Sequence, residues 1–134
     1  MLETVIAVTI FWMCVSGIAA LFVQTKQLSD KARSHYVAIN LARNQLERAG
    51  SYTEPGQLNS LSLLRESNAV VNTTGASDGE GDFRRTTMIT AGVSGVSNLT
   101  ELVVTVEIRN RKTLGWTGER EVLRCYFTEY KRKT

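Results

Sequence analysis

The sequence predicts an α+β protein in which one long N-terminal α-helix, apolar in its first half, packs on a small antiparallel β-sheet. The 20 residues Thr4–Val23 contain no charge and no proline, and every Lys and Arg lies after them. The second half of the chain contains segments in which apolar and polar residues alternate, as in half-buried strands. We divide the chain into an apolar helix over residues 1–23, an amphipathic continuation over residues 24–50 and an α+β head over residues 51–134.

The apolar segment has the length of a membrane span. Twenty helical residues cover about 30 Å, which is the hydrocarbon thickness of a bilayer. A cleaved signal peptide fits poorly, because the run is long and no basic segment precedes it. A simple membrane anchor is an alternative. The large apolar side chains lie all round the helix, as expected for burial in lipid or in a bundle: Val5, Ile6, Val8, Ile10, Phe11, Trp12, Val15, Ile18, Leu21 and Phe22.

Glu3 is the one charged residue in the first 23. A carboxylate beside a membrane helix carries a desolvation cost, so its presence suggests a partner. The N-terminal ammonium of a neighbouring chain would serve, since opposite charges about 4 Å apart attract by about 4 kcal/mol at an effective dielectric constant near 20, before desolvation. The alternative is that Glu3 lies among lipid headgroups.

The segment Met1–Val8 resembles the start of bacterial type IV pilins and of the pseudopilins of type II secretion. Their mature chains place a glutamate in a short apolar stretch that opens a long apolar helix. Ala38–Glu47 is similar to the amphipathic half of that helix in minor pilins and I-type pseudopilins. The glutamate is fifth in the family and third here, so we expect the sequence to begin inside the mature chain or at an internal start codon.

The resemblance implies a structural subunit of an extracellular type IV pilus-like helical filament. The apolar helices would pack in the filament core, with Glu3 setting the axial register against a neighbouring N-terminus. The implied partners are further copies of the chain, a prepilin peptidase, an assembly platform and ATPases. The protein would lie in the inner membrane before assembly and on the bacterial surface afterwards. Two alternatives are a minor pilin or pseudopilin that primes a type II secretion pseudopilus, and a membrane-anchored module that binds DNA or another surface.

The helix is expected to continue from Leu2 to Ala49 and to end at Gly50, which stands in the usual capping place. Gly17 is the weakest point of the apolar half, because Gly costs about 1 kcal/mol relative to Ala. In assembled pili of the resembled family a segment near there can unwind, and we assign Val15–Ala20 to that role. The amphipathic half presents one apolar stripe: Leu28, Ala32, His35, Ile39, Ala42, Leu46 and Ala49.

The head is expected to hold a short helix over Gln57–Glu66, an exposed loop over Asn68–Asp82, and a hairpin turn over Asn110–Glu119. Three strands follow from the alternation, and a sheet of three or four strands would bury the helix stripe. The predicted strands cover residues 83–91, 101–109 and 123–128.

Catalytic and metal-binding patterns are scarce. With one His and two Cys, and without a phosphate loop or nucleophile motif, the sequence predicts no enzyme and no cofactor. His35 is assigned to packing, and Cys14 and Cys125 are too far apart for an intrachain disulfide. Alternating carboxylates could wrap Ca²⁺, but the EF-hand pattern fails, and a solvated acidic loop is the better interpretation. They are Asp78, Glu80 and Asp82.

Basic groups with aromatic neighbours could contact DNA phosphates and bases. A solvated surface or salt bridges between subunits explain them equally well, so DNA ranks below both as a partner. The residues are Arg84-Arg85, Arg109–Lys112 and Lys131–Lys133, with Trp116, Tyr126 and Tyr130.

Overall fold

The structure, a computed structural model, describes residues 2–52, 58–96, 98–110 and 113–128. The chain forms two compact units, Met1–Ser34 and His35–Thr134, which we call the N-terminal unit and the C-terminal unit. Helix α1 (Leu2–Gly50) makes up the described part of the N-terminal unit and contributes residues 35–50 to the C-terminal unit.

The helix confirms the prediction of one long N-terminal α-helix. No proline interrupts it, and the single internal glycine of its apolar half is tolerated. At its end, the amide of Ser51 donates to the Arg48 carbonyl at 3.2 Å and that of Tyr52 to the Ala49 carbonyl at 3.0 Å. Gly50 is not in the left-handed conformation, so the predicted glycine cap is wrong. A tightened last turn takes its place.

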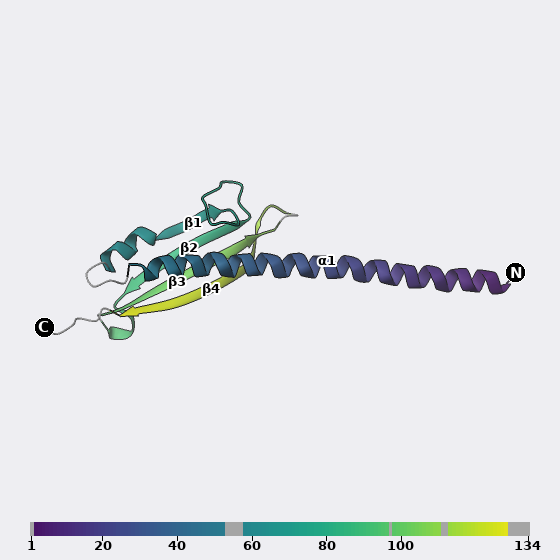
Figure 1. Ribbon diagram of the computed structural model, residues 1–134, viewed down its shortest axis with the longest axis horizontal. Helices are drawn as coiled ribbons and strands as arrows, with labels where there is room; N and C mark the ends of the chain where they lie inside the picture. Colours follow the sequence, from purple (N-terminus) through teal and green to yellow (C-terminus); the bar gives the residue numbers. More distant parts are fainter. Residues whose placement is uncertain (1, 53–57, 97, 111–112, 129–134) are drawn as a thin grey trace. The chain divides into compact units, whose positions relative to one another are not determined.

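The C-terminal unit contains a four-stranded antiparallel sheet in the order β1-β2-β3-β4, with the last turns of α1 across one face (Figure 1). This confirms the α+β layout. A 3₁₀ helix, η1 (Leu58–Leu64), precedes the sheet, and a second, η2 (Val93–Gly95), joins β2 to β3. The strands are β1 (Glu66–Val71), β2 (Phe83–Ala91), β3 (Leu99–Arg109) and β4 (Trp116–Thr128).

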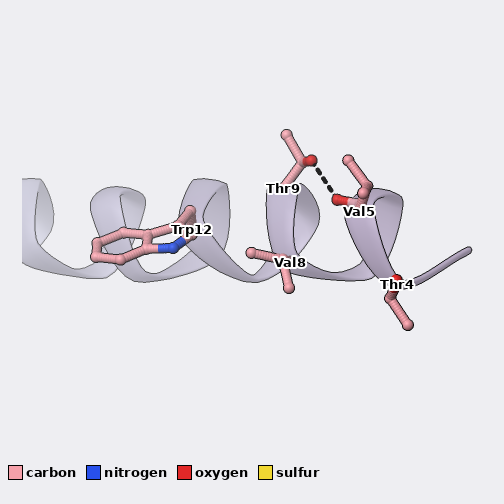
Figure 2. Close-up of a pocket in the computed structure, with 5 residues that line it drawn as sticks. All are labelled: Thr4, Val5, Val8, Thr9 and Trp12. Carbon is pink, nitrogen blue, oxygen red and sulfur yellow. Dashed lines mark hydrogen bonds between the residues drawn. The ribbon is translucent and has the colours of Figure 1, made fainter. Parts of the chain in front are cut away.

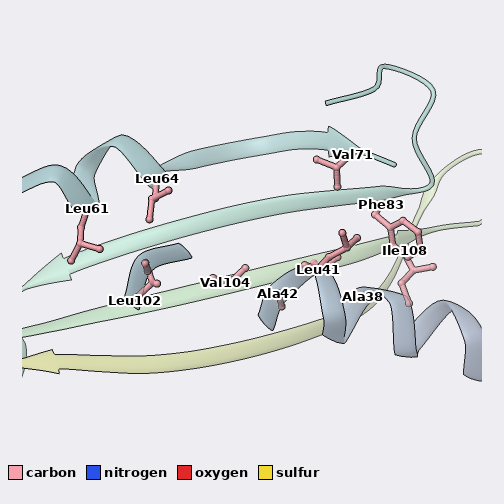
Figure 3. Close-up of a cluster of buried hydrophobic side chains, with 12 residues drawn as sticks. Ala38, Leu41, Ala42, Leu61, Leu64, Val71, Phe83, Leu102, Val104 and Ile108 are labelled. Atoms are coloured by element: carbon pink, nitrogen blue, oxygen red, sulfur yellow. The ribbon is translucent and has the colours of Figure 1, made fainter. Parts of the chain in front are cut away.

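Strand β3 supplies the centre of the core. Its buried residues alternate with half-buried ones, as the sequence pattern predicted. Ala38, Ala42 and Ala49 of α1 belong to the same buried cluster. Figure 3 shows the cluster, which consists of twelve buried apolar residues: Ala38, Leu41, Ala42, Ala49, Leu61, Leu64, Val71, Phe83, Leu102, Val104, Val106 and Ile108.

The predicted helix stripe is correct at Ala42 and Ala49, which are buried, and at Leu46, which packs against the core, but it is wrong at Ile39 and Leu28. Ile39 is 39% exposed, and Leu28, in the N-terminal unit, is 70% exposed. The buried face also includes Ala38, Leu41 and Gln45, which the predicted stripe left out. The buried face of α1 consists of Ala38, Leu41, Ala42, Gln45 and Ala49.

Strand β1 was missed, because Asn68–Asp82 was interpreted as an exposed loop. Its burial pattern does not alternate, Asn68 has φ of 54°, and the pairing register shifts between Glu66 and Ala69. A bulged edge strand of this kind lacks the period of two that sequence patterns detect. The predicted helix over Gln57–Glu66 is a 3₁₀ helix over Leu58–Leu64, and Gln57 lies outside the described residues.

Strand β4 begins at Trp116, seven residues before the predicted start at Leu123. The hairpin turn is correspondingly shorter than Asn110–Glu119, and the amide of Asn110 donates to the Gly115 carbonyl at 2.8 Å. Gly118, with φ of 75°, lies at a register shift inside the strand. It marks a bulge, although in the sequence it resembles a turn residue.

Arg85 is a buried cation on the core side of β2. Its side chain is 6% exposed and makes two hydrogen bonds to Glu66 at the start of β1, Nε to Oε2 at 2.6 Å and Nη2 to Oε1 at 3.0 Å. Gly75 lies beside it with φ of 86°, and a Cβ there would lie 3.2 Å from Leu41 Cδ2 and at an ordinary contact distance of 3.6 Å from Arg85 Nη1. The ion pair therefore joins β1 to β2 across the bulge.

Replacing Glu66 by Ala should lower the free energy of unfolding by about 3 kcal/mol, because it leaves the Arg85 guanidinium buried without a counter-charge. The matched control is Glu47→Ala, which removes a carboxylate whose pair with Arg43 is solvated, at 63% and 72% exposure. The control should cost less than about 0.5 kcal/mol. Thermal unfolding of the full chain in detergent, followed by circular dichroism, compares the two. Equal losses would contradict the structural role of the buried pair.

Candidate functional site

The large apolar side chains of the N-terminal unit are the main candidate site. All ten that the sequence analysis assigned to the helix core are exposed in the single chain, from 40% for Val15 to 72% for Phe22. Within the described residues, α1 is the one helix long and apolar enough to cross a membrane. Apolar surface of this extent is unstable in water and requires a cover of lipid or protein.

Two hydroxyl groups in the apolar half of this helix bond to carbonyls of the same helix. Thr9 Oγ1 donates to the Val5 carbonyl at 2.6 Å (Figure 2), and Ser16 Oγ donates to the Trp12 carbonyl at 2.7 Å. In an apolar environment an unpaired hydroxyl is costly, and a bond to the carbonyl four residues earlier removes that cost. The helix is therefore compatible with a surrounding that offers no water.

A shallow hollow of about 410 Å³ lies on one flank of the same helix. In Figure 2 the indole of Trp12 extends along the helix, while Val8 and Thr9 project from the preceding turn. The hollow is open and mainly apolar, so it is a surface for packing and not an enclosed ligand pocket. Its lining residues are Thr4, Val5, Val8, Thr9 and Trp12.

Glu3 lies in the first turn of α1 and is exposed. A carboxylate in this position interacts favourably with the positive end of the helix dipole. Among the described residues no cation is paired with Glu3. Met1 lies outside the described residues. The pairing of Glu3 with a neighbouring chain stays a prediction.

Helix α1 is continuous through Val15–Ala20, and nothing lies within 4 Å of the place where a Cβ on Gly17 would be. Unwinding of this segment was predicted for the assembled filament and not for the single chain, so it stays a prediction. Cys14 is exposed in the N-terminal unit and Cys125 is partly buried in the C-terminal unit, and both are free thiols.

The acidic segment Asp78–Asp82 forms a turn. Asp78 Oδ1 accepts the Glu80 amide at 3.1 Å, and the Asp78 carbonyl accepts the Gly81 amide at 3.0 Å. Among the described residues no three His, Cys, Asp or Glu side chains are grouped so as to hold a metal ion. The weak calcium candidate formed by Asp78, Glu80 and Asp82 therefore has no assembled ligand set.

The basic groups separate. Arg85 is buried in its pair with Glu66, whereas Arg84 faces outward, is paired with Glu107, and has its guanidinium carbon 4.6 Å from the centroid of the Trp116 ring. The guanidinium carbon of Arg109 is 5.9 Å from the same centroid. The rest of the predicted basic set, residues 111–112 and 131–133, and Tyr130 lie outside the described residues.

His35 joins α1 to β4 within the C-terminal unit, a contact that the sequence analysis did not predict. Its Nδ1 lies 2.7 Å from Glu121 Oε1 and its Nε2 lies 3.7 Å from Glu119 Oε2. The carboxylate of Glu121 accepts the hydrogen bond, so Nδ1 carries the proton. Glu119 and Glu121 are two residues apart in the sequence, and this spacing on a strand could have predicted a basic partner beside β4. The contact agrees with the packing role expected of His35.

Comparisons of the chain with family models, with curated proteins and with solved structures found no match. The fold and the site define the class of this protein directly. It is an α+β protein with one long N-terminal helix, apolar in its first half, and a four-stranded antiparallel sheet. The apolar helix is of a kind that could anchor the protein in a membrane.

Proposed function

We propose that the protein is a structural subunit of a type IV pilus-like filament, in which the N-terminal helices of many copies pack together in the core. The observation that supports this most is the helix itself. In the apolar half of α1 the large side chains are exposed on every side, the hydroxyls of Thr9 and Ser16 bond to carbonyls of the same helix, and the one carboxylate, Glu3, stands at the start. The likeness of Met1–Val8 to pilins and pseudopilins adds to it.

The helix would occupy two environments, the lipid of the inner membrane before assembly and a sheath of identical helices afterwards. Lipid tails are as apolar as leucine, so this transfer gains little from the hydrophobic effect. Close packing supplies cohesion, and an ion pair between Glu3 and a neighbouring N-terminus supplies direction along the filament. The prepilin peptidase, assembly platform and ATPases of the resembled family would process and move the subunit.

Electron microscopy of sheared surface filaments, with mass spectrometry of the N-terminus from the same sample, tests the proposal. Fibres made mostly of this chain, with a processed N-terminus, would establish a major subunit. A processed chain in trace amounts would favour the minor pilin or pseudopilin, which the likeness of Ala38–Glu47 suggests. An unprocessed chain confined to the membrane fraction would contradict the filament and leave the membrane-anchored binding module.

A further inference from the structure

The stretch of α1 that follows the apolar run, residues 24–34, carries an excess of positive charge. Its three basic residues outnumber its one carboxylate, Asp30, so its net charge is +2. The apolar run Thr4–Val23 contains no charge, so the positive charge begins where the apolar run ends. We call residues 24–34 the basic segment, and its basic residues are Lys26, Lys31 and Arg33.

Two cations of the basic segment share one side of the helix. Lys26 and Arg33 are both exposed and lie seven residues apart, which is about two helical turns. Neither has an ion pair among the described residues. Asp30 lies between them on the helix and offsets part of their charge, but it is not within ion-pair distance of either. Lys26 and Arg33 are therefore available to an external anion.

The distance of these cations from the apolar run fits the surface of a bilayer. At about 1.5 Å per residue, Lys26 lies about 4.5 Å and Arg33 about 15 Å beyond Val23. The polar layer of each membrane leaflet is about 5–8 Å thick. Helix side chains tilt toward the N-terminus, so both basic side chains extend back toward the apolar run. With that run in lipid, Lys26 lies among the headgroups and Arg33 lies within about one Debye length of them.

The continuity of α1 selects lipid among the anions that could bind here. The same helix contains the membrane-length apolar run and the basic segment, so insertion of the first brings the second to the headgroups. Each basic residue near an anionic membrane surface strengthens binding about fivefold. We propose that Lys26 and Arg33 bind the phosphate groups of anionic phospholipids and enrich these lipids around α1. This inference concerns the membrane-inserted chain and goes beyond the filament.

Quenching of Trp12 fluorescence by brominated lipids tests the enrichment. Trp12 lies near the middle of the apolar run, so bromine on the acyl chains of neighbouring lipids quenches it. The parent protein is the full chain with Trp116→Phe, which removes the second tryptophan. In vesicles of equal parts phosphatidylglycerol and phosphatidylcholine, each brominated in turn, the local ratio of the two lipids should exceed the bulk ratio about fivefold. Salt at about 0.5 M should remove most of the excess.

Substitutions in the basic segment assign the effect to its residues. Lys26→Gln with Arg33→Gln should bring the local lipid ratio to about the bulk value, while the helix persists because glutamine is a good helix former. Asp30→Asn should raise the ratio about fivefold further, since losing a carboxylate changes net charge as adding a basic residue does. Arg43→Gln is the matched control. Arg43 is 72% exposed, belongs to the C-terminal unit and is paired with Glu47, so the ratio should not change.

Equal quenching of the parent protein by the two brominated lipids would overturn the inference. Enrichment that survives Lys26→Gln with Arg33→Gln would assign lipid binding to another part of the chain, and the inference would again be wrong. A chain that does not insert into vesicles would refute both the lipid binding and the membrane anchor. Absence of filaments in sheared surface fractions would contradict the proposed function alone, because the lipid binding belongs to the inserted single chain.

Discussion

Replacing Glu3 by Ala should abolish filaments while leaving membrane insertion and the C-terminal unit intact. The substitution removes the one charge of the apolar segment, so insertion into lipid becomes easier and not harder. In the proposed filament, assembly would lose the ion pair between Glu3 and a neighbouring N-terminus, which is worth about 4 kcal/mol before desolvation. Because about 1.4 kcal/mol corresponds to a factor of ten, filament yield should fall at least tenfold after desolvation is counted.

The measurement is filament mass in sheared fractions, with the chain in membranes quantified in parallel. Glu3→Gln separates charge from shape and should fail like Glu3→Ala. Glu47→Ala removes a solvated carboxylate of the same helix and should assemble normally. Abundant, regular filaments from Glu3→Ala would refute the pairing of Glu3 with a neighbouring chain.

Replacing Leu61 by Ala should cost about 3 kcal/mol of unfolding free energy, because it leaves a cavity in the core of the C-terminal unit. Leu61 is fully buried between η1 and the sheet. Leu63 lies two residues along the same 3₁₀ helix and is 78% exposed. The same change at Leu63 should alter stability by less than about 0.5 kcal/mol.

Denaturant unfolding of the full-length chain in detergent, followed by tryptophan fluorescence, compares the two leucine variants. The two substitutions delete identical atoms from one short segment, so a difference between them reports burial alone. Similar losses in both variants would mean that η1 is not packed on the core as described.

The long helix and strands β2 and β3 could be predicted because their patterns are local. Alternation along β3 placed Leu102, Val104, Val106 and Ile108 inward, where the structure has them. Strand β1 could not be found in this way. Its bulge interrupts the period of two. Strand β1 is held by its pairing with the edge of β2 and by the ion pair between Glu66 and Arg85.

The dipeptide Arg84-Arg85 shows how a strand gives neighbouring residues different environments. As neighbours in the chain the two arginines form one basic group. In β2 they project to opposite faces, so Arg85 is buried against Glu66 and Arg84 lies over Trp116 on the outside. The alternation of strand side chains could have predicted this split once residues 83–91 were assigned to a strand.

The apolar helix, the chemistry of its surface and the central strands could be deduced from the amino-acid sequence alone. Helix formation and compatibility with lipid depend on composition and on bonds to carbonyls four residues away, which are local properties. Three features became visible only in the folded C-terminal unit: the exact buried face of α1, the pairing of β1, and the burial of Arg85 beside an outward-facing Arg84. These features depend on which surfaces meet in the folded chain, because burial of Ala38 and Ala42 requires the sheet residues that share their cluster, and those residues are distant in the sequence.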